Sequence, residues 1–185
     1  MKILAISGSL RADSYNTALA RAAVERAPEG TQIELYDRLG EIPPFDADSD
    51  GELTPEVVRD LRERIARSDA LLFVTPEYNG SISGILKNAI DWASRPPRGA
   101  AALWGKTSAV AGATTGQYGA IWAQQDLRRI LGIAGARVVE GELPVAQAQN
   151  VFDEDGLLRD PLLADRLRLH LENLAHEAAA MDLAA

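Results

Sequence analysis

One uninterrupted apolar run, residues 70–74 (ALLFV), most restricts the fold that this chain can adopt. Every position in it is hydrophobic, which is typical of a parallel β-strand covered by helices on both faces. A polar turn from Thr75 to Ser81 (TPEYNGS) follows at once, and a helical pattern begins behind it. In open α/β sheets ligands bind just beyond the carboxyl ends of such strands, so we expect this turn to belong to a binding site.

The rest of the chain alternates between strand-like and helix-like patterns without a linker or a low-complexity break. A doubly wound α/β fold is therefore predicted, as a single domain covering residues 1–185. The expected strands are residues 2–7, 32–36, 70–74, 107–113 and 137–143. The expected helices are residues 17–27, a helix that begins at Thr54-Pro55, and residues 85–93, 121–131 and 163–178.

Polar loops that contain glycine follow the first, third and fourth expected strands. A strand order of 2-1-3-4-5, as in flavodoxin, places these three loops side by side where the winding of the sheet reverses. We therefore predict a flavodoxin-like three-layer sandwich around a five-stranded parallel sheet. One continuous binding site is expected at the carboxyl edge of that sheet.

Composition excludes several classes of function. The chain of 185 residues has no cysteine, which removes disulfides, thiol nucleophiles and cysteine-ligated metals. Its formal net charge of −8 argues against a nucleic-acid or anionic-membrane partner, because both need a basic surface. The longest apolar stretches are strand-sized and no secretory leader is visible, so a cytoplasmic protein is expected.

The loop after the first strand, residues 8–17 (GSLRADSYNT), has the composition of a phosphate site. The following helix offers unpaired N–H groups and the positive end of its dipole, and Arg11 adds a charge-assisted donor. The side-chain donors are Ser9, Ser14, Asn16 and Thr17. The alternative is that Ser14 or Asn16 only caps the helix and that Arg11 is a solvated surface charge. A phosphate site here and a flat turn after the third strand together suggest a flavin nucleotide.

Three ordered motifs resemble those of the NAD(P)H-dependent FMN reductase family, which includes quinone, chromate and azo reductases. They are GSLR with SYN in residues 8–16, TPEYN in residues 75–79 and LKNAIDW in residues 86–92. The resemblance implies non-covalent FMN as the cofactor and NADPH or NADH as the co-substrate. Two electrons would pass by hydride transfer through FMN to a quinone, an azo compound, chromate or a free flavin. The alternative is a flavodoxin-type FMN electron carrier between protein partners.

The resemblance also implies three groups of FMN-binding residues. The phosphate would be bound by Ser9, Arg11, Ser14, Tyr15 and Asn16, with Thr17 beside them. The flavin ring would lie against the turn formed by Pro76, Glu77, Tyr78, Asn79 and Gly80. Thr115 and Gly116 occupy the place of a third flavin-contacting loop, for which the alternative is a turn that caps the next helix. No side chain is assigned as a catalytic acid or base; Tyr78 and Tyr118 are the side chains expected nearest the reacting face.

The remaining motifs favour structural roles. Lys87 and Asp91 are four residues apart on an expected helix and can pair on its exposed face. His170 and His176 are six residues apart and do not share a helix face, so no metal site is expected. The GKT sequence at residues 105–107 precedes a strand, whereas a phosphate-binding P-loop follows one.

The resemblance further implies a homodimer or homotetramer. A small domain offers only a shallow cleft, and hydride transfer benefits from excluding water, so we expect the flavin pocket to be bordered by two subunits. The aromatic residues that would suit an interface core are Tyr78, Trp92, Tyr118 and Trp122. The alternative buries Trp92 and Trp122 in the core of their own subunit. Arg95 and Arg98 fall at the amino ends of the strands, so we expect neither to bind the 2′-phosphate of NADPH in the same subunit.

Overall fold

A computed structural model describes residues 1–96 and 99–182 of the chain. Five strands form one parallel sheet in the order β2-β1-β3-β4-β5, which confirms the predicted flavodoxin-like topology. The strands are β1 Lys2–Ser7, β2 Gln32–Tyr36, β3 Ala70–Val74, β4 Thr107–Ala113 and β5 Arg137–Val145. The α-helices are α1 Tyr15–Glu25, α2 Glu56–Arg67, α3 Gly84–Ala93, α4 Ile121–Ile133 and α5 Pro161–Asp182. Short 3-10 helices lie at Leu39–Glu41, Ala47–Ser49 and Ala148–Asn150.

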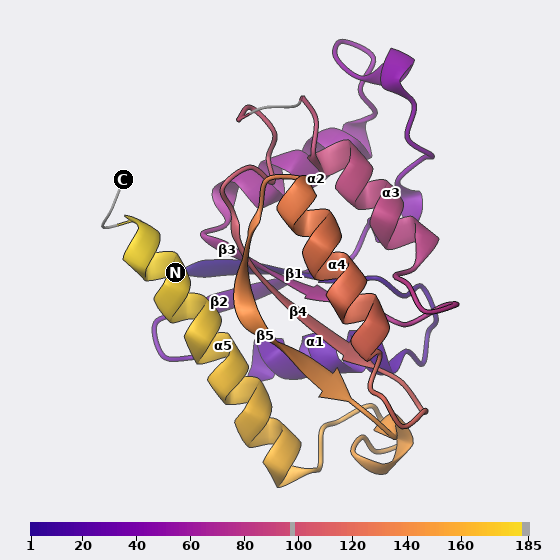
Figure 1. Cartoon of the computed structure of the whole chain (residues 1–185), viewed down its shortest axis with the longest axis vertical. Helices are drawn as coiled ribbons and strands as arrows, with labels where there is room; N and C mark the ends of the chain where they lie inside the picture. Colours follow the sequence, from indigo (N-terminus) through magenta and orange to yellow (C-terminus); the bar gives the residue numbers. More distant parts are fainter. Residues whose placement is uncertain (97–98, 183–185) are drawn as a thin grey trace.

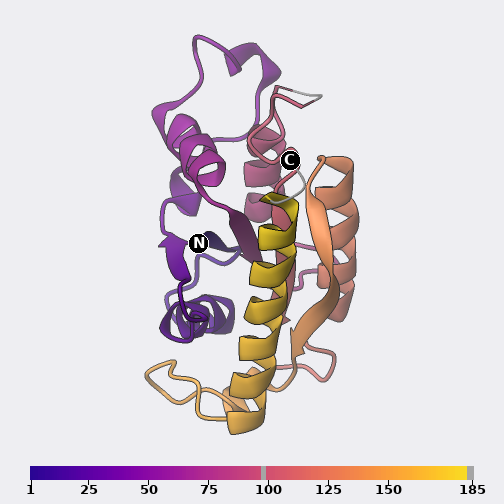
Figure 2. The same cartoon turned by 90° about the vertical axis from the view of Figure 1, so that its left-hand side faces the viewer.

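Helices cover both faces of the sheet, and each face has its own apolar core. Helices α1 and α5 pack against one set of strand residues, which includes Ala5 and Leu72. Helices α2, α3 and α4 pack on the opposite face, against Leu4, Leu71 and Phe73. In Figure 1, α2 and α3 lie above the strands and α1 lies below them. Figure 2 turns the molecule so that α5 runs across the near side. The strand β3 is buried along its whole length, as its apolar run predicts.

Helix starts differ from the sequence prediction because of local capping. Helix α1 begins at Tyr15, before the expected residue 17, since the Ser14 hydroxyl accepts a hydrogen bond from the Thr17 N–H at 3.4 Å. Thr54, at the expected start of α2, does not cap this helix. Its hydroxyl accepts a backbone N–H of the preceding loop at 2.8 Å, and Pro55 takes the N-cap position.

The strand β5 continues past its expected end at residue 143. Its pairing with β4 shifts register through a β-bulge and then resumes as far as the pair Ala113–Val145. Arg128 on α4 covers the bulge by donating from Nη1 to the Val139 carbonyl at 2.5 Å. A bulge bends its strand locally, and the Arg128 guanidinium gives the Val139 carbonyl there a hydrogen-bond partner.

The LKNAIDW segment forms most of α3 and holds the loop after β2 against that helix. Asn88 accepts a hydrogen bond from the Phe45 N–H at 2.7 Å and donates to the Pro43 carbonyl at 2.9 Å. Trp92 Nε1 donates to the same Pro43 carbonyl at 2.9 Å. The Trp92 side chain is fully buried in its own subunit, so its expected place in a subunit interface is wrong. This motif anchors the long loop that projects at the top of Figure 1.

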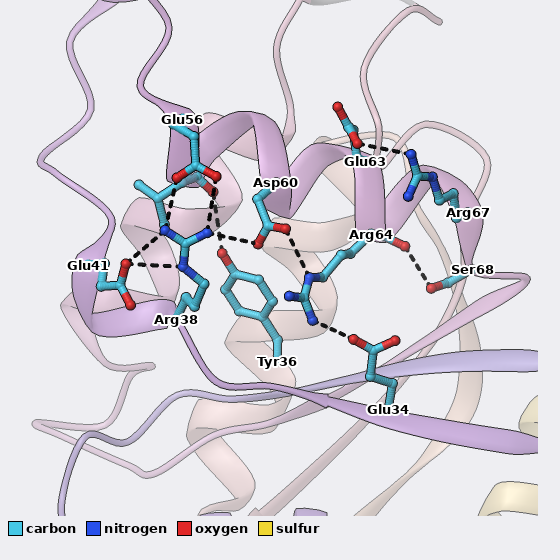
Figure 3. Close-up of polar contacts among 11 residues, drawn as sticks. Glu34, Tyr36, Arg38, Glu41, Glu56, Asp60, Glu63, Arg64, Arg67 and Ser68 are labelled. Atoms are coloured by element: carbon cyan, nitrogen blue, oxygen red, sulfur yellow. Dashed lines mark hydrogen bonds and ion pairs between the residues drawn. The ribbon is translucent and has the colours of Figure 1, made fainter.

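A network of ion pairs joins β2 and its following loop to α2 (Figure 3). The Arg38 guanidinium binds the carboxylates of Glu41 and Glu56, each at 2.9 Å. The Tyr36 hydroxyl donates to a backbone carbonyl of α2 at 3.3 Å. Burial, with the nearby Asp60 carboxylate, raises the pKa of Tyr36 to about 12. Exposed ion pairs contribute at most about 1 kcal/mol each to stability, so the network adds only modestly to the packing of the strand against the helix.

Candidate functional site

The loops after β1, β3 and β4 meet at the carboxyl edge of the sheet and border a cleft of about 110 Å³. All three loops contribute to it, as the strand order predicts. The cleft is lined by Ser9, Arg11, Ser14, Tyr15, Asn16, Pro76, Glu77, Tyr78, Ala113, Thr114 and Thr115. Four of the predicted site residues, which are Thr17, Asn79, Gly80 and Gly116, lie outside this lining, and so does Tyr118.

Close packing against α3 fixes the start of the first loop. A Cβ atom at Gly8 would lie 3.0 Å from a methyl carbon of Leu86, so glycine lets the loop and the helix approach. The Ser83 hydroxyl, which caps α3, donates to the Gly8 carbonyl at 2.6 Å. The Thr17 hydroxyl is 2.9 Å from the Ser7 hydroxyl and ties α1 to the end of β1. The first loop is therefore held at both of its ends.

The middle of the first loop presents donors that suit an anion. Ser9, Ser14 and Tyr15 border the cleft where α1 begins. Arg11 is exposed there, and within the described part of the chain its guanidinium makes no ion pair or hydrogen bond. An unpaired guanidinium beside a helix N-terminus is a suitable receptor for a phosphate group. The residues present therefore fit the phosphate end of FMN.

Asn16 joins the first loop to the third. Its side chain is buried, and its amide Nδ2 donates to the Ala113 carbonyl at 3.0 Å. Its Oδ1 accepts the Ala113 N–H at 2.8 Å. Both groups of the amide are thus engaged with the end of β4, and the pair fixes the distance between two walls of the cleft.

The turn after β3 has the backbone of a tight hairpin. The N–H and carbonyl groups of Tyr78 and Ser81 pair with each other at 2.9 and 3.1 Å. Between them Asn79 and Gly80 both have left-handed backbones, with φ of 53° and 74°. Asparagine and glycine are the residues that adopt this conformation most readily, so the Asn-Gly pair sets the shape of the turn. The turn places Pro76 in the wall of the cleft and exposes half of the Tyr78 side chain beside it.

Glu77 connects this turn to α4. Its carboxylate accepts a hydrogen bond from the Ala123 N–H, in the first turn of α4, at 3.1 Å. Neither Thr114 nor Thr115 caps that helix; the N-cap position belongs to Ala120, which has no capping side chain. The alternative interpretation of the third loop as a helix-capping turn is therefore not supported for its threonines.

The third loop is held by the segment that follows β5. The Thr114 carbonyl accepts the Ala148 N–H at 3.0 Å, and the Gly116 carbonyl accepts the Gln147 N–H at 2.9 Å. Thr115 is exposed at the rim of the cleft. Ala113 and Thr114 also line the cleft but were not identified from the sequence. Their position at the carboxyl end of β4, as its last residue and the one after it, was the signal that could have identified them.

Other candidate sites are less well supported by the structure. In residues 1–96 and 99–182, no group of three or more histidine, cysteine, aspartate or glutamate side chains could hold a metal ion. No helix within those ranges is long and apolar enough to cross a membrane. Arg95 lies over the ring of Phe45 and does not line the cleft. Arg98 lies outside the described residues.

The fold and the cleft define a flavodoxin-like α/β protein with a cluster of hydrogen-bond donors at the carboxyl edge of its sheet. A family model described as NADPH-dependent FMN reductase matches residues 1–150. The chain belongs to this family.

Relatives of known name agree with that assignment. An NAD(P)H-dependent FMN reductase of Pseudomonas aeruginosa is 43% identical over 175 residues, which cover 94% of this chain and 93% of the relative. A quinone reductase of Pseudomonas putida is 39% identical, over 85% of this chain and 84% of the relative. The solved structure of a flavoenzyme NAD(P)H:(acceptor) oxidoreductase from Paracoccus denitrificans is 33% identical with a TM-score of 0.86, and covers 97% of both chains.

Proposed function

We propose that this chain is an FMN-dependent oxidoreductase that moves two electrons from NADPH or NADH to a small-molecule acceptor. The acceptor class is a quinone, an azo compound, chromate or a free flavin. The observation that carries the proposal is the meeting of three polar loops in one cleft whose donors suit a phosphorylated flavin. The named relatives, which are FMN and quinone reductases, support the same activity.

We assign phosphate binding to the first loop. The donors are the hydroxyls of Ser9 and Ser14, the Arg11 guanidinium and the N-terminal N–H groups of α1, all of which belong to residues at the cleft or to the helix that begins there. Tyr15 packs over Phe152 at 6.0 Å between ring centroids, so its ring is held at the edge of this site. Asn16 acts through Ala113, by keeping the first and third loops at a fixed separation.

We assign binding of the flavin ring to the turn after β3. Within the described part of the chain, the backbone N–H groups of Glu77, Asn79 and Gly80 have no hydrogen-bond partner. These donors suit the carbonyl and nitrogen edge of an isoalloxazine ring. FMN, when bound, supplies the hydride-accepting and electron-passing chemistry, while the protein supplies position and electrostatics. We expect Tyr78, half-exposed at the cleft, to limit the entry of water to the bound ring.

Anaerobic reduction of the loaded protein tests the proposed activity. Adding NADPH or NADH to the FMN complex should remove the visible flavin absorbance without any second protein. Restoring the absorbance with a quinone would complete the two half-reactions. Absence of any change with both nucleotides contradicts the proposal, and reduction that requires an added protein partner would favour the electron-carrier alternative.

We also propose a homodimer or homotetramer. A groove of about 740 Å³ lies between α3 and α4, and it contains the exposed apolar side chains Trp104 and Ile133. The predicted ion pair between Lys87 and Asp91, at 2.6 Å, lines the same groove. Ser81 belongs both to this groove and to the ring-binding turn, which supports a flavin pocket bordered by a second copy.

Light scattering during size exclusion tests this assembly. The expected mass is two or four times the chain mass of 19.9 kDa. Ile133→Glu should shift the protein toward the monomer, because Ile133 is 76% exposed in the isolated chain. Leu169→Glu, at an exposed apolar side chain on α5, is the matched control and should leave the mass unchanged. A fully active species with the mass of one chain contradicts the shared pocket.

We place the protein in the cytoplasm. A chain without cysteine needs no oxidising compartment, and its composition is compatible with this location. The proposed nicotinamide reductant is a cytoplasmic metabolite as well. Fractionation of cells that express the chain with antibody detection is the direct check, and recovery outside the cytoplasmic fraction contradicts the location.

A further inference from the structure

Gln124 is a completely buried amide on α4 that the proposed site does not use directly. It lies against the ends of β3 and β4. A Cβ atom at Gly112 would be 2.8 Å from the Thr75 carbonyl oxygen and 3.1 Å from Gln124 Nε2. The glycine at residue 112 therefore leaves room for the amide beside the last residue before the ring-binding turn.

The Gln124 amide holds the third loop where that loop enters α4. Its Nε2 donates to the Gly119 carbonyl at 2.8 Å and to the Ala120 carbonyl at 3.3 Å. Both residues have left-handed backbones, with φ of 60° and 59°. A residue with a Cβ atom is strained in this region, so Ala120 needs its surroundings to keep it there. Gln124 supplies two of the contacts that do so.

The acceptor end of the same amide has no partner. Gln124 Oε1 is buried and makes no hydrogen bond within the described residues. An unsatisfied buried acceptor is destabilising, and an unbranched apolar side chain of similar length would avoid it. Stability alone thus does not account for an amide at this position. The hydrogen bonds that Nε2 donates to the third loop explain why an amide stands here.

We propose that Gln124 is a positioning residue for the flavin site. It fixes the third loop, whose Thr114 and Thr115 line the cleft, relative to the strand end that carries the ring-binding turn. That turn is itself attached to α4 through the Glu77 carboxylate and the Ala123 N–H. Two walls of the cleft are therefore attached to helix α4, and Gln124 fixes the position of one wall relative to the other. This inference rests on the proposed binding of FMN.

Gln124→Met is the direct test, because methionine keeps the length of the side chain and removes its donors. We expect FMN affinity, measured by flavin fluorescence quenching, to fall about tenfold or more. Riboflavin affinity should fall by the same factor, since the phosphate loop is untouched. The apo variant should retain the far-UV circular dichroism of the wild type. Gln125→Met, at the exposed neighbouring glutamine, is the matched control and should bind FMN as the wild type does.

Two results of this experiment overturn the inference. One is a folded Gln124→Met protein that binds FMN as tightly as the wild type. The other is an equal loss in Gln125→Met. Failure of the wild type itself to bind FMN would instead contradict the proposed function, so the two failures are distinguishable.

If Gln124→Met does not fold, a second variant tests the positioning role of Gln124. Gln124→Glu restores one donor only while its buried carboxyl is protonated, and burial raises the pKa of such a group. Its FMN affinity relative to the wild type should be nearly normal at about pH 6 and should fall about tenfold by about pH 9. A ratio that does not change with pH overturns the positioning role.

Discussion

At the scale of single residues, Asn16 shows how one side chain can join two loops of the site. The amide is buried and exchanges two hydrogen bonds with the backbone of Ala113, a residue 97 positions further along the chain. A pattern of serine and asparagine after a strand predicts a polar loop, and it predicted that Asn16 would belong to the site. It gave no information on the partner, because the pairing depends on the sheet order and not on the local sequence.

Replacing Asn16 tests that pairing through stability. Asn16→Leu leaves the N–H and carbonyl of Ala113 without their partners, and an unsatisfied buried polar group costs about 1–3 kcal/mol. We expect the free energy of unfolding, from chemical denaturation, to fall by at least about 2 kcal/mol. Asn173→Leu, at an exposed position of α5, is the control and should change it by less than about 0.5 kcal/mol. A small loss in Asn16→Leu would contradict the structural role.

Glu77 and Gln124 also support the site through contacts with residues that are distant in the sequence. The Glu77 carboxylate caps a helix that begins 44 residues later, at Ile121, and Gln124 braces that helix against the third loop. The sequence motif TPEYN identified Glu77 as a site residue through resemblance to a family. Nothing near Gln124 in the sequence marks it, since its importance arises from the room left by Gly112 in a neighbouring strand.

At the scale of elements, the strands were more predictable than the helix ends. The strands β1, β2, β3 and β4 have the predicted limits. The apolar run of β3 is buried between two helical layers, and β2 shows the alternating burial of an edge strand. The start of α1 and the end of β5 depend on a cap and on a bulge. Both are decided by individual hydrogen bonds, which hydrophobic periodicity does not report.

Helix α5 contains a partly buried histidine, His170, whose Nε2 atom is buried and has no hydrogen-bond partner among the described residues. Burial lowers the pKa of His170 from 6.5 to about 4; a hydrogen bond with the Val110 backbone opposes the shift, and the Arg128 and Arg166 charges add to it. Between these two values the unfolded chain binds a proton that the folded chain does not. The stability that neutral His170 provides is therefore complete above about pH 6.5 and is lost as the pH falls toward 4.

The pH dependence that His170 gives to stability is measurable. A tenfold change in a proton-binding constant corresponds to about 1.4 kcal/mol, so the lowered pKa of His170 predicts an effect of about 3 kcal/mol. His170→Leu should reduce the slope of unfolding free energy against pH between about 4 and 6.5, measured by denaturation at a series of pH values. His176→Leu, at an exposed position on the same helix, should keep the slope of the wild type. Equal slopes in the wild type and in His170→Leu would contradict the account.

At the scale of the whole molecule, the strand order explains why one cleft exists at all. With β1 next to β3 and β3 next to β4, the loops that follow these strands must lie side by side. The formal net charge of −8 means that the global field opposes an anionic ligand. The local donors of the first loop must therefore outweigh that field, with Arg11 as the one guanidinium in the lining of the cleft as the structure describes it.

The comparison of FMN with riboflavin, which lacks the phosphate, tests this central claim most directly. The double variant Arg11→Ala, Ser14→Ala should weaken FMN binding about tenfold or more, because charge-assisted hydrogen bonds are the strong ones. Riboflavin affinity should change much less, and Arg21→Ala, at an exposed position of α1, should change neither. Fluorescence titration of both ligands gives the two ratios. An equal loss for FMN and riboflavin in the double variant would contradict the assignment of the first loop as the phosphate site.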